Sequence, residues 1–252
     1  MNGLKIYSQN WLDENCAITC LSGDALKAYL YDQNQETKYS SSGSDDATEE
    51  TIEIIFKNWQ GTEISRTFDR IIMLNHNVKS GGADYWNGSA WVAIPEAAMT
   101  AETTAYKYVS VASAISASRV RMRLSTTQTA NAQKFIGELK FCLSILDGTQ
   151  LWRSSLPRQD EQRSGYERTG DGRLVFYREW TKFAASGQLY DVAKADHDLL
   201  LPYMKAAEFI TIVFYEDHAP EDCFECAIVN APRRDINRKT GLYEISLELQ
   251  ER

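Results

Sequence analysis

Short segments in which apolar and polar residues alternate recur along the chain, and they constrain its fold more than any other feature. The segment "TIEIIF" places Ile52, Ile54 and Phe56 on one side and Glu53 on the other. This is the pattern of a β-strand with one buried face, because successive strand side chains point to opposite faces. The segments "RVRMRL", "ELKFCL" and "YEISLELQ" repeat it. The sequence therefore predicts a mainly β chain of short strands arranged as a sandwich or jelly roll.

Two further segments refine this prediction. "FDRIIML" is continuously apolar, as a strand buried on both faces is. In "ADYWNGSAWVAI", Asn87 and Gly88 separate two aromatic-rich runs, which predicts a hairpin with a two-residue type I′ turn. The segment "SVASAISAS" is small and polar, and it fits a strand or a loop equally.

One segment, "ADHDLLLPYMKAAEF", predicts a helix. Asp196 suits its N-cap, and Leu200, Tyr203 and Met204 share a face. Pro202 removes a backbone donor, so the helix either begins late, near Pro202, or kinks there.

Changes in strand periodicity and polarity divide the chain into three parts. Residues 1–148 are rich in strand patterns, whereas residues 149–170 are polar and without sustained periodicity. Residues 171–252 return to strands and contain the helix. We therefore predict a β domain over 1–148, a connector or extended arm over 149–170, and a second β domain with one helix over 171–252.

Composition limits the partners. The 252 residues carry a formal net charge of −8, divided evenly between residues 1–148 and 149–252. Such a surface is repelled by a phosphate backbone, so nucleic-acid binding is not expected. No segment has the roughly 20 apolar residues of a membrane span, and the start lacks a secretory pattern, so we expect synthesis and folding in a cytoplasm.

The cysteines do not predict a disulfide framework, because five is an odd number in a chain without an export pattern. Cys223 and Cys226 form a CxxC, and His218 precedes it. A structural zinc site needs four ligands, so this pattern is half complete. The alternative is a strand whose thiols pack as small apolar groups.

No enzymatic constellation is evident. The sequence lacks a phosphate-binding glycine loop, HExxH and GxSxG. His76 and His197 have no adjacent nucleophile, and the run from Asp45 to Glu50 resembles a solvated acidic loop more than a buried acid pair. We expect no catalytic activity.

The stretch "LYDQNQETKYSSS" resembles the early loop of galactose-binding-like jelly rolls, the discoidin or coagulation factor type C group and related carbohydrate-binding modules. The matching positions are Asp32, Asn34, Thr37, Tyr39, Ser40 and Ser41. In that family the loop pins the first strand to the sandwich and often holds a structural calcium. The resemblance implies calcium ligands at Asp32 and Asn34; a network of Asx turns is the alternative. No other cofactor is expected.

Sugar binding in that family uses loops and an aromatic platform. Tyr85, Trp86 and Trp91 flank the expected turn and are the candidates for such a platform. Aromatic residues in a hairpin also serve as cross-strand packing pairs, which is the alternative for these three.

Residues 171–252, which end in "YEISLELQER", resemble the tail-tube-like β-sandwich of bacteriophage distal tail and baseplate proteins. That family often joins this ring-forming domain to a galactose-binding-like module. The resemblance implies a homo-oligomeric ring, a hexamer in preference to a trimer, with tube and hub proteins as neighbours.

Two segments of opposite charge fit a head-to-tail contact between ring subunits. They supply the candidate interface residues Arg233, Arg234, Arg238, Lys239, Glu221 and Asp222. Two solvated loops are the alternative. The sequence thus predicts a structural protein of a phage tail tip, located in the virion, with a host cell-surface glycan as a further partner. The alternative function is a carbohydrate-binding adhesin or enzyme-accessory module.

Overall fold

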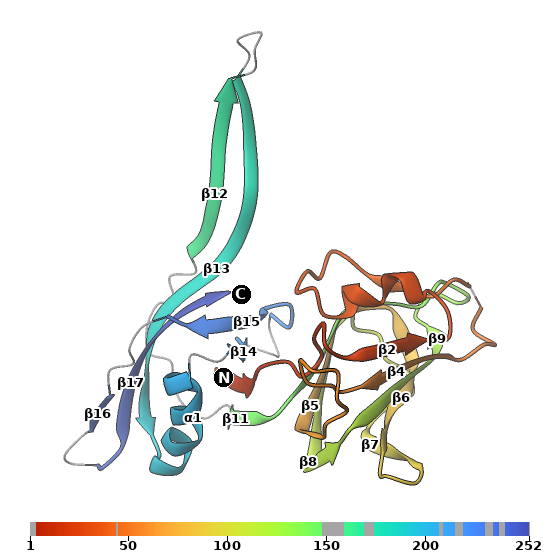
Figure 1. The fold of residues 1–252 in the computed structure, drawn as a ribbon, viewed down its shortest axis with the longest axis horizontal. Helices are drawn as coiled ribbons and strands as arrows, with labels where there is room; N and C mark the ends of the chain where they lie inside the picture. The colour runs from red at the N-terminus through yellow and green to blue at the C-terminus, as the bar shows by residue number, and fades with distance from the viewer. Residues whose placement is uncertain are drawn as a thin grey trace. The chain divides into compact units, whose positions relative to one another are not determined.

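The computed structural model describes residues 4–43, 45–147, 159–168, 174–206, 209–214, 219–229, 234–236 and 240–251. The chain divides into two compact units. We call residues 8–144 with 218–221 the sandwich unit, and residues 1–7, 145–217 and 222–252 the sheet unit. The chain is mainly β (Figure 1), which confirms the predicted fold class.

The sandwich unit contains two antiparallel sheets. The five-stranded sheet has the order β2 (Ala17–Cys20), β4 (Glu50–Ile55), β9 (Arg119–Thr127), β6 (Val78–Trp86) and β7 (Trp91–Met99). The four-stranded sheet has the order β3 (Tyr39–Ser40), β10 (Phe135–Cys142), β5 (Arg66–His76) and β8 (Lys107–Ala117). A 3₁₀ helix, η1 (Asp24–Leu30), lies between β2 and β3 in the chain.

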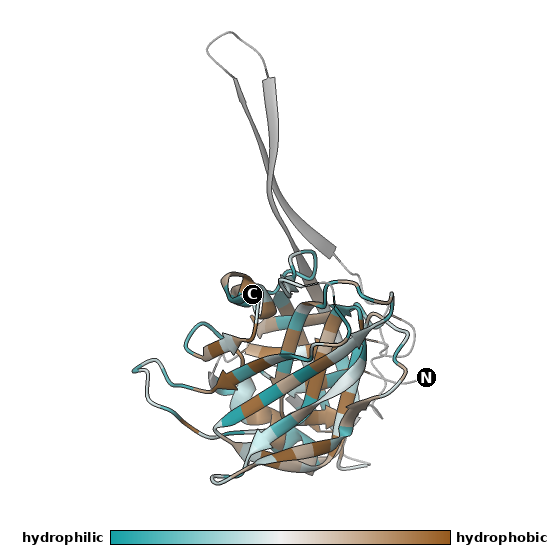
Figure 2. Ribbon diagram, turned by 90° about the vertical axis from the view of Figure 1, so that its right-hand side faces the viewer, coloured by the Kyte–Doolittle hydropathy of each residue, from teal (hydrophilic) through white to brown (hydrophobic). Residues whose placement is uncertain are grey.

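Inward side chains of both sheets form one core. Ile52, Ile54 and Phe56 are fully buried, as the alternation of their segment predicts. Phe56, Phe68 and Phe141 contact one another, with ring centroids 5.4 to 6.5 Å apart. Apolar and polar bands alternate along the strands (Figure 2). The core therefore follows from period-2 patterning and is centred on an aromatic cluster.

Strand β10 departs from its predicted pattern. Leu139 and Phe141 belong to the core, as expected. Glu138 and Lys140, on the other face, are also buried, and the ammonium of Lys140 donates to the Glu138 carboxylate at 2.5 Å. The alternation correctly predicts which residues share a face. It does not predict that the polar face is covered, because an ion pair can make a charged face compatible with burial.

The sheet unit contains one sheet built from distant parts of the chain. Its order is β11 (Ser144–Asp147), β1 (Lys5–Ser8), β14 (Phe209–Val213), β15 (Cys223–Ile228), β17 (Tyr243–Glu251), β13 (Leu174–Val192) and β12 (Gln159–Arg168), with β16 (Arg234–Ile236) paired to β17. Ile245, Leu247 and Leu249 of β17 face its core, as predicted.

The unit boundaries differ from the expected 1–148 and 171–252. Strand β1 at the N-terminus and strand β11 lie in the sheet unit, so the sandwich unit is inserted between them. The backbone N–H of Ser8 donates to the carbonyl of Leu143 at 2.8 Å where the chain enters and leaves the sandwich unit. Periodicity shows that a segment is a strand, but it does not show which sheet the strand joins.

The predicted helix is α1 (Lys194–Ala206), and it begins two residues before the expected N-cap. The N–H of His197 already donates to the carbonyl of Ala193 at 2.9 Å, which places Asp196 in the first turn. Its charge there complements the helix dipole. Pro202 lies inside the helix, so the late start is wrong. Leu200 and Met204 pack in the core of the sheet unit, as predicted.

Strands β12 and β13 form a long arm (Figure 1). β12 has 10 residues, and all of them pair with the outer part of β13, from Gln159 opposite Ala184 to Arg168 opposite Leu174. The inner part of β13, from Ala184 to Val192, pairs with β17. The predicted connector thus contains a strand over 159–168; residues 149–158 and 169–170 lie outside the described residues. None of the described helices is long and apolar enough to cross a membrane.

Candidate functional site

The early loop holds itself together through its own polar side chains. One carboxylate oxygen of Asp32 accepts from the N–H of Asn34 at 3.0 Å, and the other accepts from the Thr37 hydroxyl at 2.6 Å. The Asn34 side-chain oxygen accepts from the N–H of Glu36 at 3.1 Å. This is the Asx-turn alternative.

The two expected calcium ligands are a poor match for that ion. Calcium takes 6–8 oxygen ligands, whereas Asp32 is a single carboxylate whose two oxygens already accept hydrogen bonds. The described residues contain no cluster of three or more His, Cys, Asp or Glu side chains suited to a metal. We therefore derive no metal-dependent step from this loop.

Tyr39 fastens the loop to the sandwich. Its side chain is fully buried, and its hydroxyl lies 2.7 Å from Oε1 of Glu50 and 2.9 Å from the carbonyl of Ser22. Burial raises the pKa of Tyr39, and the hydrogen bond with Glu50 adds to this effect. Glu50 also accepts from the backbone N–H and the hydroxyl of Ser22, at 2.8 and 2.7 Å. The loop at the entrance to β4 therefore acts as a clasp.

A hollow of about 290 Å³ lies beside this clasp. It is lined by Leu21, Ser22, Ser41, Ser42, Gly43, Asp45, Thr48, Glu50 and Lys134. The buried ammonium of Lys134 donates to the carbonyls of Asp45 and Thr48, at 2.5 and 3.0 Å. Leu21 is 61% exposed at the hollow. The hollow thus combines a polar, hydrogen-bonded floor with an apolar rim.

Sequence reasoning missed this hollow. The expectation of a fully solvated acidic run is wrong for Glu50, which is 4% exposed. Its hydrogen bonds to Ser22 and Tyr39 replace those to water. One sequence feature could have predicted the burial of Glu50. It is the first residue of an alternating strand, and it lies on the same face as Ile52 and Ile54.

Two residues of the expected aromatic platform, Trp86 and Trp91, form a cross-strand pair. Trp86 and Trp91 face each other at the end of the β6–β7 hairpin, with ring centroids 5.6 Å apart and the planes at 68°. The Arg121 guanidinium lies 4.7 Å from the Trp91 ring centroid. Tyr85 is half-buried and packs against the core. The three residues are close in space, but packing occupies part of their surface.

The turn of this hairpin is not the predicted type. Trp86 pairs with Trp91, so the loop has four residues rather than two. Gly88 has a φ of 99°, whereas Asn87 does not have a positive φ. The Asn87 side-chain oxygen accepts from the N–H groups of Ser89 and Ala90, at 3.0 and 2.9 Å. An Asx interaction therefore replaces the second left-handed residue of a type I′ turn.

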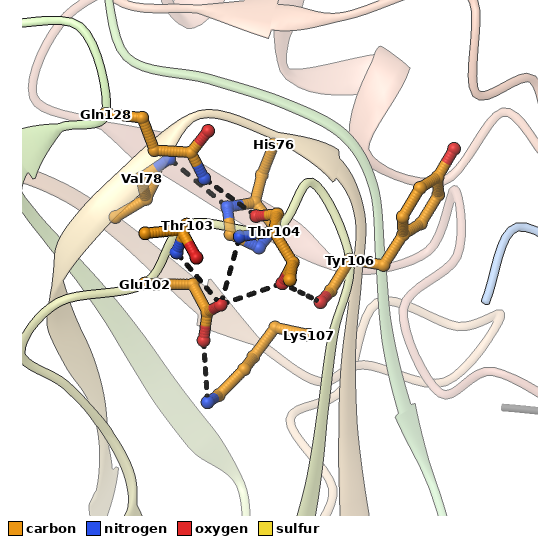
Figure 3. Close-up of polar contacts among 8 residues, drawn as sticks. All are labelled: His76, Val78, Glu102, Thr103, Thr104, Tyr106, Lys107 and Gln128. Carbon is orange, nitrogen blue, oxygen red and sulfur yellow. Dashed lines mark hydrogen bonds and ion pairs between the residues drawn. The ribbon is translucent and has the colours of Figure 1, made fainter. Parts of the chain in front are cut away.

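His76 belongs to a polar cluster with Glu102 and Lys107 (Figure 3). His76 is 1% exposed; its Nδ1 accepts from the N–H of Val78 at 3.2 Å, and its Nε2 has no hydrogen-bond partner. Burial lowers the pKa of His76 to about 4; Glu102 opposes the shift, and Lys107 adds to it. The imidazole is therefore neutral near pH 7.

Glu102 forms several hydrogen bonds within the loop between β7 and β8. It accepts from Lys107 Nζ at 2.8 Å and from the hydroxyl of Thr104 at 2.7 Å. Burial alone would raise the pKa of Glu102, but these hydrogen bonds outweigh it and hold the pKa at about 2. The hydrogen bonds of Glu102 to Thr104 and Lys107 therefore stabilise the loop between β7 and β8.

The expected interface residues are partly described. Glu221 is exposed, and its carbonyl accepts from the side chain of Gln35 at 3.1 Å. The carbonyl of Asp222 accepts from the N–H of Phe214. Arg234 is the first residue of β16. Arg233, Arg238 and Lys239 lie outside the described residues, so a contact between the two charged segments stays a prediction.

The CxxC segment is a strand, which is the alternative to a zinc site that the sequence offered. Cys223 and Cys226 are both buried in β15. Residues three apart in a strand point to opposite faces, so these two thiols do not form one side of a common metal site. His218 lies outside the described residues.

No protein-family model matches the sequence, and no curated protein matches it. Solved structures of carbohydrate-binding modules resemble its fold. One is CpGH89CBM32-6, produced by Clostridium perfringens, with 16% identity and a TM-score of 0.42 over 53% of this chain and 98% of that one. Another is the family 32 module of C. perfringens NanJ in complex with galactose, with 14% identity and a TM-score of 0.43 over 54% and 98%.

A third is chitosan-binding module 1 of a chitosanase/glucanase from Paenibacillus sp. IK-5. It has 15% identity and a TM-score of 0.42 over 53% of this chain and 98% of the module. Each match covers about half of this chain. These are similarities of fold, and the ligands named for those proteins are their own. The class that the structure itself defines is a mainly β protein.

Proposed function

We propose that this protein is a structural component of a bacteriophage tail tip. In this proposal, copies join through the sheet unit into a ring, a hexamer in preference to a trimer, beside tube and hub proteins. The sandwich unit serves as a peripheral module with a carbohydrate-binding-like fold. The protein is made in the cytoplasm of the bacterial host and assembled into the virion.

The observation that carries the proposal is the arm. Strand β12 is the last strand of its sheet, and among the described strands only β13 pairs with it. A strand at a sheet edge presents unpaired N–H and C=O groups, which another chain can complete. A two-stranded ribbon is at best marginally stable alone in water, so an arm of this length favours a partner.

The charged segments near β15 and β16 supply a second support. Glu221 and Asp222 are acidic, and the segment around Arg234 is basic. Opposite charges on two segments of one chain suit a head-to-tail contact, which closes into a ring when the rotation allows.

Shortening the arm is expected to abolish assembly. The variant replaces residues 161–182 by Asn-Gly, which joins Asp160 to its pairing partner Phe183 through a tight turn. Negative-stain microscopy and light scattering should show rings of the full chain, which the variant should not form. Circular dichroism checks that the variant is folded, and Trp86→Ala is the matched control that should assemble normally. A single-chain mass for the full chain at every concentration, also when it is co-expressed with neighbouring tail proteins, contradicts the proposal.

A second candidate is a carbohydrate-binding adhesin or accessory module. The observation that favours it is the position of Trp86 and Trp91 at the tip of a hairpin, where both rings are partly exposed. In this case Trp86→Ala should weaken glycan binding about tenfold, the size of one aromatic contact. A glycan array followed by titration of the best ligand measures this, with Tyr29→Ala as a control. The absence of glycan binding by the full chain removes this candidate.

A further inference from the structure

Trp59 is the most exposed large apolar side chain among the described residues, at 81% exposure. It lies in the turn between β4 and β5, beyond the end of β4. Tryptophan is on average a highly buried residue, and its exposed ring is the typical anchor of a binding contact.

The turn that carries Trp59 is fixed before any contact forms. The Asn58 side-chain oxygen accepts from the N–H groups of Gln60 and Thr62, at 3.1 and 2.9 Å. The Asn58 N–H donates to the carbonyl of Thr62 at 3.0 Å. Gly61 has a φ of 80°, which a glycine adopts without strain. An anchor on a pre-organised turn loses little conformational entropy on binding.

The polar groups at the base of the turn satisfy one another. The Glu63 carboxylate accepts from the Ser118 hydroxyl at 2.6 Å and from the Arg119 guanidinium twice, at 2.9 Å. They therefore offer little hydrogen-bonding capacity for a sugar, whose recognition needs convergent polar groups beside the aromatic ring. The features of the turn favour insertion of the indole into a hollow of another protein surface.

Such a hollow exists at the opposite end of the same strand. The hollow of about 290 Å³ includes Glu50, the first residue of β4, whereas Trp59 follows the last residue, Ile55. Ligand pockets usually measure about 300–1,000 Å³, so this one suits a single large side chain. Leu21, 61% exposed at its rim, offers apolar contact to an indole ring.

The charges at the Trp59 turn and at the hollow are also of opposite sign. Glu63 is paired with Arg119 at the turn, and Lys57 adds a positive charge there. The hollow has Asp45 exposed in its lining, while the formal charges of its two buried lining residues, Glu50 and Lys134, cancel. Trp59, which we call the knob, and the hollow lie at opposite ends of β4. They cannot meet within one copy, because the strand separates them by about 20 Å.

We propose that Trp59 of one copy enters the hollow beside Glu50 of the next copy, which gives a head-to-tail contact between sandwich units. This contact is heterologous and therefore continues from copy to copy until it closes. It does not depend on the arm, so it stands or falls separately from the proposed tail-tip function.

Two variants of the full chain test the contact. Trp59→Ala removes the knob, and Ser42→Arg fills the hollow from an exposed position. Each should weaken self-association of the sandwich units by about 30-fold, the loss expected for a hot-spot tryptophan. Sedimentation velocity over a concentration series measures the association. The fluorescence difference between the wild type and Trp59→Ala reports burial of the Trp59 ring. Tyr29→Ala, which removes another exposed aromatic ring, is the matched control and should associate normally.

Mixing the two variants gives the decisive result. Trp59→Ala retains the hollow and Ser42→Arg retains the knob, so an equal mixture should restore one sandwich-unit contact for each pair of copies, which neither variant forms alone. Restored pairs support the proposal. Unchanged association of either variant, failure of the mixture to pair, or a Trp59 fluorescence shift with monosaccharides or phosphatidylcholine vesicles but not with protein concentration overturns it.

Discussion

Replacing Phe141 with alanine is expected to lower the free energy of unfolding of the sandwich unit by about 3–5 kcal/mol. Phe141 is fully buried between Phe56 and Phe68, with ring centroids 5.9 and 5.4 Å away. Its removal eliminates buried apolar area and leaves a cavity beside two rings, one directly after β4 and one in β5. This cost is a large fraction of the total stability of an ordinary domain.

Urea unfolding followed by tryptophan fluorescence measures the effect, because four of the six tryptophans lie in residues 8–144. Trp59→Ala is the control: it removes an even larger aromatic side chain from an exposed position, and its effect should stay within about 0.5 kcal/mol. A loss below about 1 kcal/mol for Phe141→Ala would show that the two sheets do not pack around this aromatic cluster.

The sandwich unit is expected to lose about 3 kcal/mol of stability as the pH falls from about 6.5 to about 4. The pKa of His76 is lowered from 6.5 to about 4 by burial. Between these values the unfolded chain binds a proton at this residue and the folded chain does not. Acid therefore favours the unfolded state, and the contribution of His76 is complete only above pH 6.5.

Denaturant midpoints from pH 7.5 to 4.5 test this expectation. His76→Gln keeps a neutral polar side chain and removes the titration, so its stability should change less with pH over this range. Glu102, whose pKa is lowered from 4.5 to about 2, loses its contribution only below pH 4.5 and is thus separated from His76. Equal pH dependence in the wild type and His76→Gln would contradict the buried, neutral histidine.

The sequence predicts strands better than it predicts their partners. Val120, Met122 and Leu124 are buried at alternate positions of β9, as the pattern requires. The Asx turns of the early loop, at Asp32 and Asn34, were the alternative that its residues offered, and the structure contains them. These features are predictable because strand periodicity and Asx turns are determined by neighbouring residues.

Features that depend on distant residues were not predictable. Strand β1 joins a sheet whose other strands come from residues 144 onward, so the insertion of the sandwich unit leaves no local signal. Glu50 and Lys134 are buried because Ser22, Tyr39 and carbonyls of the 45–48 loop meet them. Composition alone places such charged residues on the surface. Both the hollow and the domain boundary therefore required the three-dimensional structure.

We propose that the outer edge of β12 pairs with another copy of the chain. Hydrogen–deuterium exchange of the amides of residues 159–168, measured across a concentration series of the full chain, tests it most directly. We expect the protection of these amides to rise with concentration, together with the mass of the particle. Fast exchange of the outward amides at all concentrations, with a constant mass of one chain, would contradict it.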